Sequence, residues 1–236
     1  MYPVTARPER IADGTVHVLG VVLALAGAIW LMIMHSAQSG SGQMAALAIY
    51  GVALIATFTA SAVYHLAPWH HLRPALRRFD HAAIYLKIAG TYTPLVVMVG
   101  TPLAYGILSI VWGLAAIGMT LKLFFWRAPG RFGPALYLIM GWLSVILMWS
   151  LWSVAPQGVV ALMIIGGALY TGGVVLYKSK RRYTTALWHG CVVIASGCFW
   201  AAIMLGATPA TASILSNTTY GLSPAYYQNS STPYFR

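Results

Sequence analysis

Apolar residues fill long runs of this chain, and only short polar stretches separate one run from the next. A helix needs about 20 apolar residues to cross the hydrocarbon core of a bilayer. Seven runs approach that length, at residues 16–34, 44–65, 79–99, 103–125, 134–152, 159–177 and 185–205. Backbone groups inside lipid must be hydrogen-bonded within their own element, so each run should form an α-helix. The pattern predicts an all-α fold, a seven-transmembrane helix bundle over residues 1–206, followed by a polar, poorly ordered external tail at 207–236.

The composition agrees with a membrane protein. Only 7% of the 236 residues are charged and 59% are hydrophobic, whereas a soluble globular domain carries roughly 25% charged residues. Lysine and arginine together number 14 against three acidic residues, a surplus that nucleic-acid-binding proteins also show. Because the basic residues fall in the short gaps between apolar runs, we expect membrane lipids as partners and no nucleic acid.

Gaps that contain basic residues alternate along the chain with gaps that contain no charge. The gaps after the first, third and fifth runs carry no charge, whereas the segment before the first run and the other gaps are basic. These basic residues are Arg7, Arg10, Arg73, Arg77, Arg78, Arg127, Arg131, Lys178, Lys180, Arg181 and Arg182, and Lys122 lies at the end of the fourth run, just before its basic gap. Lysine and arginine in short loops stay on the cytoplasmic side. The alternation therefore predicts a cytoplasmic N-terminus, an odd number of spans and an external C-terminus.

Few ionisable residues fall at membrane depth, and such residues are candidates for function. His65 ends the second run, Asp80 opens the third and His189 lies one turn into the seventh, so the topology places all three near the cytoplasmic interface. Ser61 lies four residues before His65, on the same helix face. Imidazole and carboxylate groups together suit a divalent transition metal such as zinc. The alternatives are that Asp80 only caps its helix and that the histidines only reach toward water.

Three further residues near this depth have simpler explanations. Lys87 lies two turns beyond Asp80 on a similar face, and it either pairs with Asp80, which we prefer, or extends toward water. His81 points from a different face and is expected at the interface. His17 opens the first run, where it either supports the site or, as we prefer, is an interfacial polar residue.

Several ordered motifs resemble one family. They are SAVYH at 61–65, RFDHAAIY at 78–85, AGTYTP at 89–94, YLIMGW at 137–142, GGALY at 166–170 and WH at 188–189. Over residues 9 to 205 the chain resembles the hemolysin III family, the bacterial branch of the progestin and adiponectin Q receptor (PAQR) superfamily. The resemblance implies a seven-helix protein of a bacterial inner membrane, with its N-terminus in the cytoplasm.

The resemblance also implies a zinc ion near the cytoplasmic face. In the family pattern three histidines bind the metal, and they correspond here to His65, His189 and position 185, which is Thr185 in this chain. Asp80 and Ser61 match the residues that orient water. Because threonine is a poor zinc ligand, either Asp80 coordinates directly, or His81, His17 or another group substitutes, or the metal is weak or absent. We predict His65, His189 and Asp80 as metal ligands, and Asp80 and Ser61 as catalytic residues.

Three functions follow as hypotheses. The first is a zinc-dependent hydrolase or sensor of a lipid amide or ester, since a metal-activated water can attack a carbonyl group. The second is a non-enzymatic protein of membrane-lipid homeostasis with a degenerate metal site, which the missing third histidine favours. The third is a pore-forming cytolysin, as the family name suggests. Most runs are apolar all round, which gives a water-filled pore little support.

Overall fold

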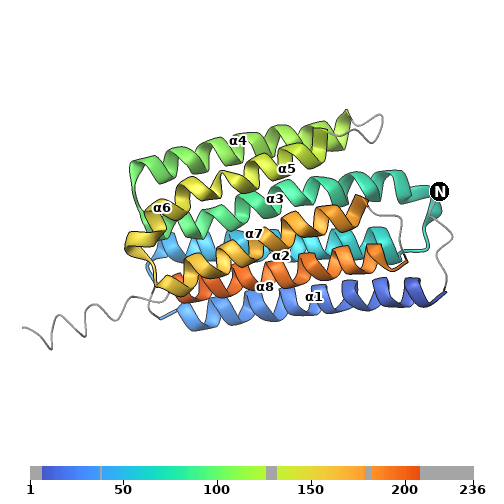
Figure 1. Ribbon diagram of the computed structural model, residues 1–236, viewed down its shortest axis with the longest axis horizontal. Helices are drawn as coiled ribbons and strands as arrows, with labels where there is room; N and C mark the ends of the chain where they lie inside the picture. Colours follow the sequence, from blue (N-terminus) through green and yellow to red (C-terminus); the bar gives the residue numbers. More distant parts are fainter. Residues whose placement is uncertain (1–6, 38, 126–131, 179–181, 208–236) are drawn as a thin grey trace, which may run out of the picture.

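The computed structural model describes residues 7–37, 39–125, 132–178 and 182–207, and every regular element within these ranges is a helix (Figure 1). The elements are α1 (Arg7–His35), α2 (Ser41–Leu66), the short 3₁₀ helix η1 (His70–Leu72), α3 (Arg73–Val99), α4 (Pro102–Phe124), α5 (Phe132–Trp142), α6 (Ser144–Val154), α7 (Gln157–Lys178) and α8 (Thr184–Ala207). Seven stretches among them are long and apolar enough to cross a membrane. The predicted all-α, seven-span bundle is confirmed. The tail predicted at 207–236 lies, beyond Ala207, outside the described residues.

The fifth span is built from two helices. A turn at Leu143 separates α5 from α6, although the whole stretch Leu136–Val154 is apolar enough to be one span. The hydroxyl of Tyr92 on α3 donates to the carbonyl oxygen of Met140 at 2.7 Å, and the hydroxyl of Ser144 donates to that of Gly141 at 2.6 Å. Side chains that bond to helix carbonyls compete with the backbone ladder, which accounts for a break at this point.

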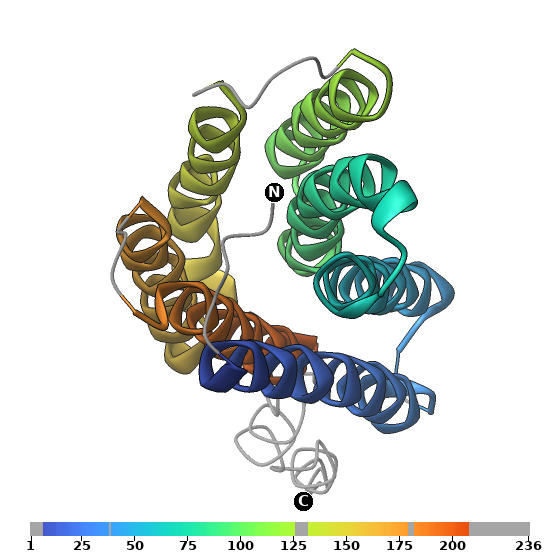
Figure 2. The same cartoon turned by 90° about the vertical axis from the view of Figure 1, so that its right-hand side faces the viewer.

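The spans follow one another around the bundle in chain order, and α8 returns to lie beside α1 (Figure 2). α3 is the most enclosed of the described spans, because 67% of its most apolar 18-residue stretch is buried inside the bundle. Its approach to α2 depends on Gly90, where an added Cβ would lie 2.5 Å from the Cβ of Ala53. A tight contact of this kind between small residues is typical of helices that pack within membranes.

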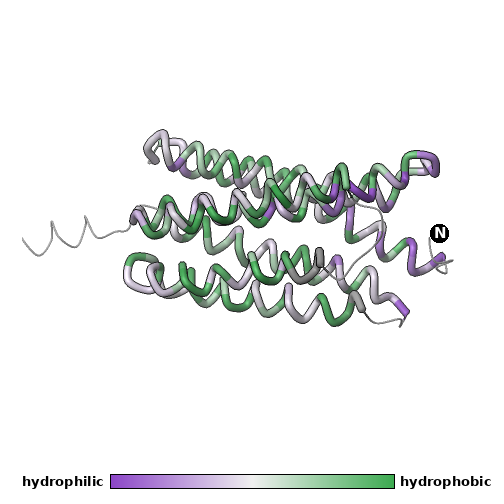
Figure 3. Tube along the Cα trace, turned by 90° about the horizontal axis from the view of Figure 1, so that it is seen from above, coloured by the Kyte–Doolittle hydropathy of each residue, from purple (hydrophilic) through white to green (hydrophobic). Residues whose placement is uncertain are grey.

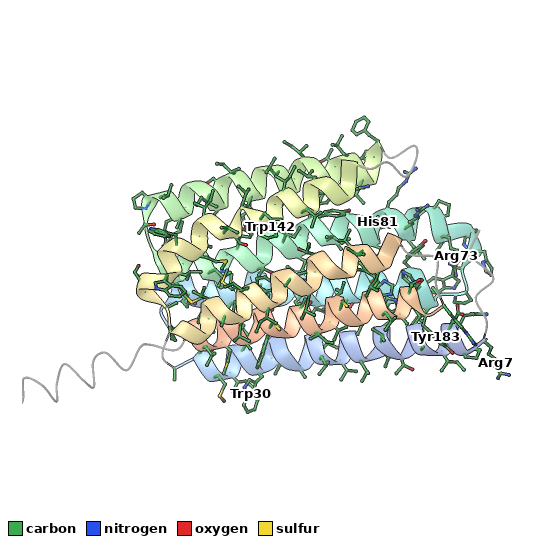
Figure 4. All side chains as sticks on the ribbon, in the orientation of Figure 1. Arg7, Trp30, Arg73, His81, Trp142 and Tyr183 are labelled. Carbon is green, nitrogen blue, oxygen red and sulfur yellow. The ribbon has the colours of Figure 1, made fainter. Side chains whose placement is uncertain are left out.

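The outer surface is apolar, and the polar residues gather at one end. Trp149 is 87% exposed, and Trp30 points away from the bundle (Figure 4). Hydrophilic residues concentrate at the end where α1 begins (Figure 3), the end that also carries Arg7 and Arg73. This is the pattern of an integral membrane protein. That this end faces the cytoplasm stays a prediction.

The first helix begins earlier than its apolar run. α1 starts at Arg7, whereas the run suggests a start at residue 16. The additional turns bring Asp13 into the helix, where it is buried together with His17. The early start therefore adds a carboxylate to the interior of the bundle.

Candidate metal centre

Three helices each contribute a histidine that follows a polar residue by four positions. The pairs are Asp13 and His17 on α1, Ser61 and His65 on α2, and Thr185 and His189 on α8. Residues i and i+4 share one face of a helix. α1 has α2 on one side and α8 on the other, so the three histidines meet in the interior near the polar end.

The carboxylate of Asp13 joins the three imidazoles. Its Oδ1 accepts a hydrogen bond from Nδ1 of His189 at 2.7 Å, and its Oδ2 accepts one from Nδ1 of His65 at 3.1 Å. Nε2 of His17 lies 3.6 Å from the same Oδ2. One carboxylate thus touches imidazoles from all three helices, including its own.

The three imidazole rings pack against one another. The ring centroid of His17 lies 4.5 Å from that of His65 and 4.3 Å from that of His189, and the latter two are 4.6 Å apart. Asp13 and His17 are only 7% and 3% exposed. Nε2 of His17 is fully buried, and among the described residues it has no hydrogen-bond partner. A buried imidazole nitrogen without a hydrogen bond is costly, unless it ligates something.

The donor set fits a transition metal. One donor atom from each of Asp13, His17, His65 and His189 can be chosen so that all four lie within 4.8 Å of one another. Tetrahedral zinc, with ligands at 2.0–2.2 Å, would separate its donors by about 3.4 Å, so shifts on the order of 1 Å would close the set. Imidazole nitrogen and carboxylate oxygen are ligands that such metals accept. This group can therefore bind a metal ion.

The structure brings together only part of the predicted site. His65 and His189 meet, as the topology suggested, but the carboxylate between them belongs to Asp13. Oδ2 of Asp80 instead lies 3.5 Å from Nδ1 of His81. Asp80 remains near α2: Thr57, one turn before Ser61, donates to the carbonyl oxygen of Ala83, one turn after Asp80, at 2.9 Å.

Two other expectations can be compared with the structure. Lys87 does not pair with Asp80 and donates instead to Oγ of Ser196 at 2.6 Å, because its side chain extends inward between helices. That pairing prediction was wrong. Thr185 has an exposed side chain at the start of α8, so His17, from another helix, supplies the third imidazole of the cluster.

Sequence reasoning missed Asp13 and underrated His17. Both lie before or at the start of the apolar run, which made them appear to be residues of the interface. The signal that was present is spacing. Asp13 and His17 repeat the four-residue separation of Ser61 and His65, and all these residues lie at the same end of their spans.

The fold and the cluster together define a class: integral membrane proteins of seven helices with a buried histidine–aspartate group at one end. The family described as "Haemolysin-III related" matches residues 7–200 of this chain. The chain therefore belongs to the hemolysin III family, within the PAQR superfamily.

Curated relatives from bacteria and mammals are similar over most of their length. A "Hemolysin-3 homolog" of Bacillus subtilis (strain 168) is 32% identical over 188 residues, covering 78% of this chain and 88% of the relative. "Hemolysin-3" of Bacillus cereus is 32% identical over 183 residues, covering 77% and 84%. The human "Monocyte to macrophage differentiation factor" is 29% identical over 204 residues, covering 83% of each.

Proposed function

We propose that this protein is a zinc-dependent hydrolase of a lipid amide or ester in the inner membrane of a bacterium, with its polar end in the cytoplasm. The observation that carries the proposal is the meeting of three imidazoles and one carboxylate, from three helices, with donor atoms within 4.8 Å. His17, His65 and His189 would be the nitrogen ligands. His17 replaces the histidine that the family pattern expects at position 185.

The surrounding residues have roles that follow from their contacts. A zinc ion held by such ligands supplies Lewis-acid activation of water and of a carbonyl group. Asp13 would either be the fourth ligand or hold the imidazoles of His65 and His189 in their orientations through their Nδ1 atoms. Asp80 and Ser61, on the neighbouring helices α3 and α2, would position water. The carboxylate of Asp80 would accept its proton, because a carboxylate beside the site is a suitable general base.

A lipid substrate suits the location of the site. The cluster lies inside a bundle whose exterior is covered by exposed large apolar side chains. Molecules that share the bilayer with these helices reach the bundle at high local concentration. An amide or ester bond near the headgroup of a lipid would lie at the depth of a cluster placed close to the membrane interface.

The first test is metal content. Zinc bound to the purified protein would be measured by inductively coupled plasma mass spectrometry for the wild type and for His17→Ala, His65→Ala and His189→Ala. We expect about one zinc per chain in the wild type, and loss of most of it in each variant. His71→Ala is the matched control, because His71 is exposed in η1. Equal zinc in the wild type and all four variants would remove the site.

The second test measures hydrolytic activity. Release of fatty acid from a short-chain fluorescent ceramide and from a matching ester would be followed for the wild type and for Asp80→Asn. We expect Asp80→Asn to keep its zinc and to lose activity by about 10²–10⁴-fold, the usual contribution of a general base. A zinc-loaded wild type that cleaves neither bond would reject the hydrolase.

One observation favours a second candidate, a metal site that only holds helices together. The cluster offers four protein donors, the number typical of structural zinc, whereas a catalytic zinc keeps one position open. In that case the protein would act in membrane-lipid homeostasis without hydrolysis. Removing zinc would then lower the melting temperature, and a deletion strain's lipid profile would be restored equally well by the wild type and by Asp80→Asn.

A further inference from the structure

A lysine lies in the interior of the bundle, well away from the metal centre. Lys87 follows Asp80 by seven residues on α3, which places it about 10 Å deeper along the helix axis. Its side chain is only 8% exposed. Ser196 and Phe58, which it contacts, are likewise seven residues from His189 and His65. Lys87 and its neighbours thus form a separate layer, two helical turns from the cluster.

Among the described residues, the polar and aromatic contacts of Lys87 are all with uncharged groups. Nζ donates to Oγ of Ser196 at 2.6 Å. It also lies 4.9 Å from the ring centre of Phe58 and 5.0 Å from that of Tyr170. The faces of these rings attract a cation, but none of the three neighbours carries a negative charge.

Each acidic side chain of this protein interacts with a group other than Lys87. The chain contains three acidic residues in all. Glu9 lies 3.2 Å from Nε of Arg182, Asp13 binds the imidazoles of the cluster, and Asp80 pairs with His81. A charged ammonium in a low-dielectric interior is strongly unfavourable without a counter-ion. An anion from another molecule would supply the counter-ion that the described residues do not offer.

The hydroxyl groups of Ser196 and Tyr170 already donate their protons, whereas that of Tyr50 has no acceptor among the described residues. Ser196 donates to the carbonyl oxygen of Val192 at 2.6 Å, so its Oγ accepts both from Lys87 and from the hydroxyl of Tyr170, 2.9 Å away. Tyr50 packs against the helix that carries Lys87: a Cβ added at Gly90, one turn beyond Lys87 on α3, would lie 3.8 Å from the Cα of Tyr50. Tyr50 is 1% exposed, and in the described part of the chain its hydroxyl has no hydrogen-bond partner. A buried hydroxyl without a partner is costly, and it offers a donor to a ligand.

We propose that Lys87 is the cationic centre of an anion-binding site in the membrane interior, completed by the hydroxyl of Tyr50. The ligand would carry one negative charge. Its anionic group would pair with Nζ of Lys87 and accept a hydrogen bond from the hydroxyl of Tyr50. The shared chemistry is that of a monovalent anion, either the carboxylate of an alkyl chain or a small inorganic anion such as chloride. The aromatic surroundings, Phe58 and the pair of Tyr170 and Phe199 rings 6.0 Å apart, suit an alkyl chain. The site does not depend on the metal or on hydrolysis.

The first experiment measures thermal unfolding in a neutral maltoside detergent and chloride-free buffer. Laurate is compared with dodecanol, which has the same chain length without the charge, and sodium chloride with sodium gluconate at equal ionic strength. We expect laurate to raise the melting temperature of the wild type by about 5 °C and dodecanol to have a much smaller effect. If chloride stabilises more than gluconate while laurate matches dodecanol, the anion is inorganic. If neither anion stabilises more than its control, the proposal is wrong.

Variants link the effect to the site. Lys87→Met keeps the length of the side chain and removes the charge, and Lys122→Met at the end of α4 removes a charge outside the site. We expect Lys87→Met to weaken binding of the anion at least about tenfold, and Lys122→Met to leave it unchanged. Tyr50→Phe should weaken binding with the fold intact, and it provides the test if Lys87→Met does not fold. Unchanged affinity in the variants that fold would overturn the assignment.

One further readout separates a binding site from a structural hydrogen bond. Without anion, Lys87→Met should melt at least as high as the wild type, because exchanging an uncompensated buried charge for an apolar side chain is neutral or stabilising. A marked fall in its anion-free melting temperature would show that Lys87 serves the fold, and would count against the proposal.

Discussion

Replacing Asp13 with asparagine removes the negative charge at the centre of the histidine–aspartate group while keeping the size of the side chain. In the wild type the carboxylate accepts hydrogen bonds from His65 and His189 at 3.1 and 2.7 Å. Asparagine keeps one acceptor oxygen and presents an N–H₂ group where the other oxygen was. One of the two imidazole N–H groups then loses its acceptor, and the rings are no longer held in one orientation.

The size of the effect follows from these two bonds. A hydrogen bond to a charged group contributes about 1.5–3 kcal/mol, and loss of a group that orients metal ligands typically weakens metal binding about 10–100-fold. We therefore expect Asp13→Asn to weaken zinc binding by at least about tenfold. If Asp13 is itself a ligand, the loss should exceed about 100-fold, so the magnitude distinguishes the two roles.

Zinc affinity would be measured by competition with a fluorescent chelator of known affinity, using metal-stripped protein in detergent. Glu9→Gln is the matched control, because Glu9 lies one turn earlier on α1 and pairs with the exposed Arg182. The control should bind zinc as the wild type does, since exposed ion pairs contribute little. Equal affinities for Asp13→Asn and the wild type would refute the role of this carboxylate.

Three other outcomes can be checked. Thr185→His should restore zinc to His17→Ala, because position 185 lies one turn before His189 and can supply the missing imidazole; zinc content that stays at the level of His17→Ala would contradict this. Gly90→Val should lower the free energy of unfolding by about 1–3 kcal/mol, because a Cβ there would meet Ala53 at 2.5 Å; Gly106→Val, whose Cβ would meet nothing within 4 Å, is the control in thermal melts. Purified protein in liposomes should show no conductance above that of protein-free liposomes, since the core of the bundle is filled by apolar side chains; stable channel currents would support the cytolysin instead.

The number of spans could be predicted because a membrane helix must be apolar over about 20 residues, and runs of that length can be recognised in the sequence. The start of α1 could not, because Asp13 and His17 are polar yet buried, and a hydropathy pattern places such residues outside the membrane. The break at Leu143 was equally hidden, since a hydrogen bond from Tyr92 on another helix contributes to it.

The candidate site, too, could be predicted from the sequence only in part. His65 and His189 could be brought together from sequence, because each lies near the same end of its span and the topology fixes that end. Which carboxylate lies between them depends on the rotation of each helix about its axis, and side-chain packing sets that rotation. Asp80 and Asp13 lie at similar depth, and only the packed bundle shows that Asp13 faces the imidazoles.

The donors of the cluster come from the first, second and last described spans, and α8 closes the ring of helices against α1. During synthesis, α1 and α2 enter the bilayer long before α8 leaves the ribosome. For all that time His17 and His65 lack their third imidazole partner. A metal that binds at this cluster would then have to be loaded at the end of translation, and a chain truncated before His189 would lack one of its donors. Bound metal would thus mark a polypeptide whose insertion has been completed.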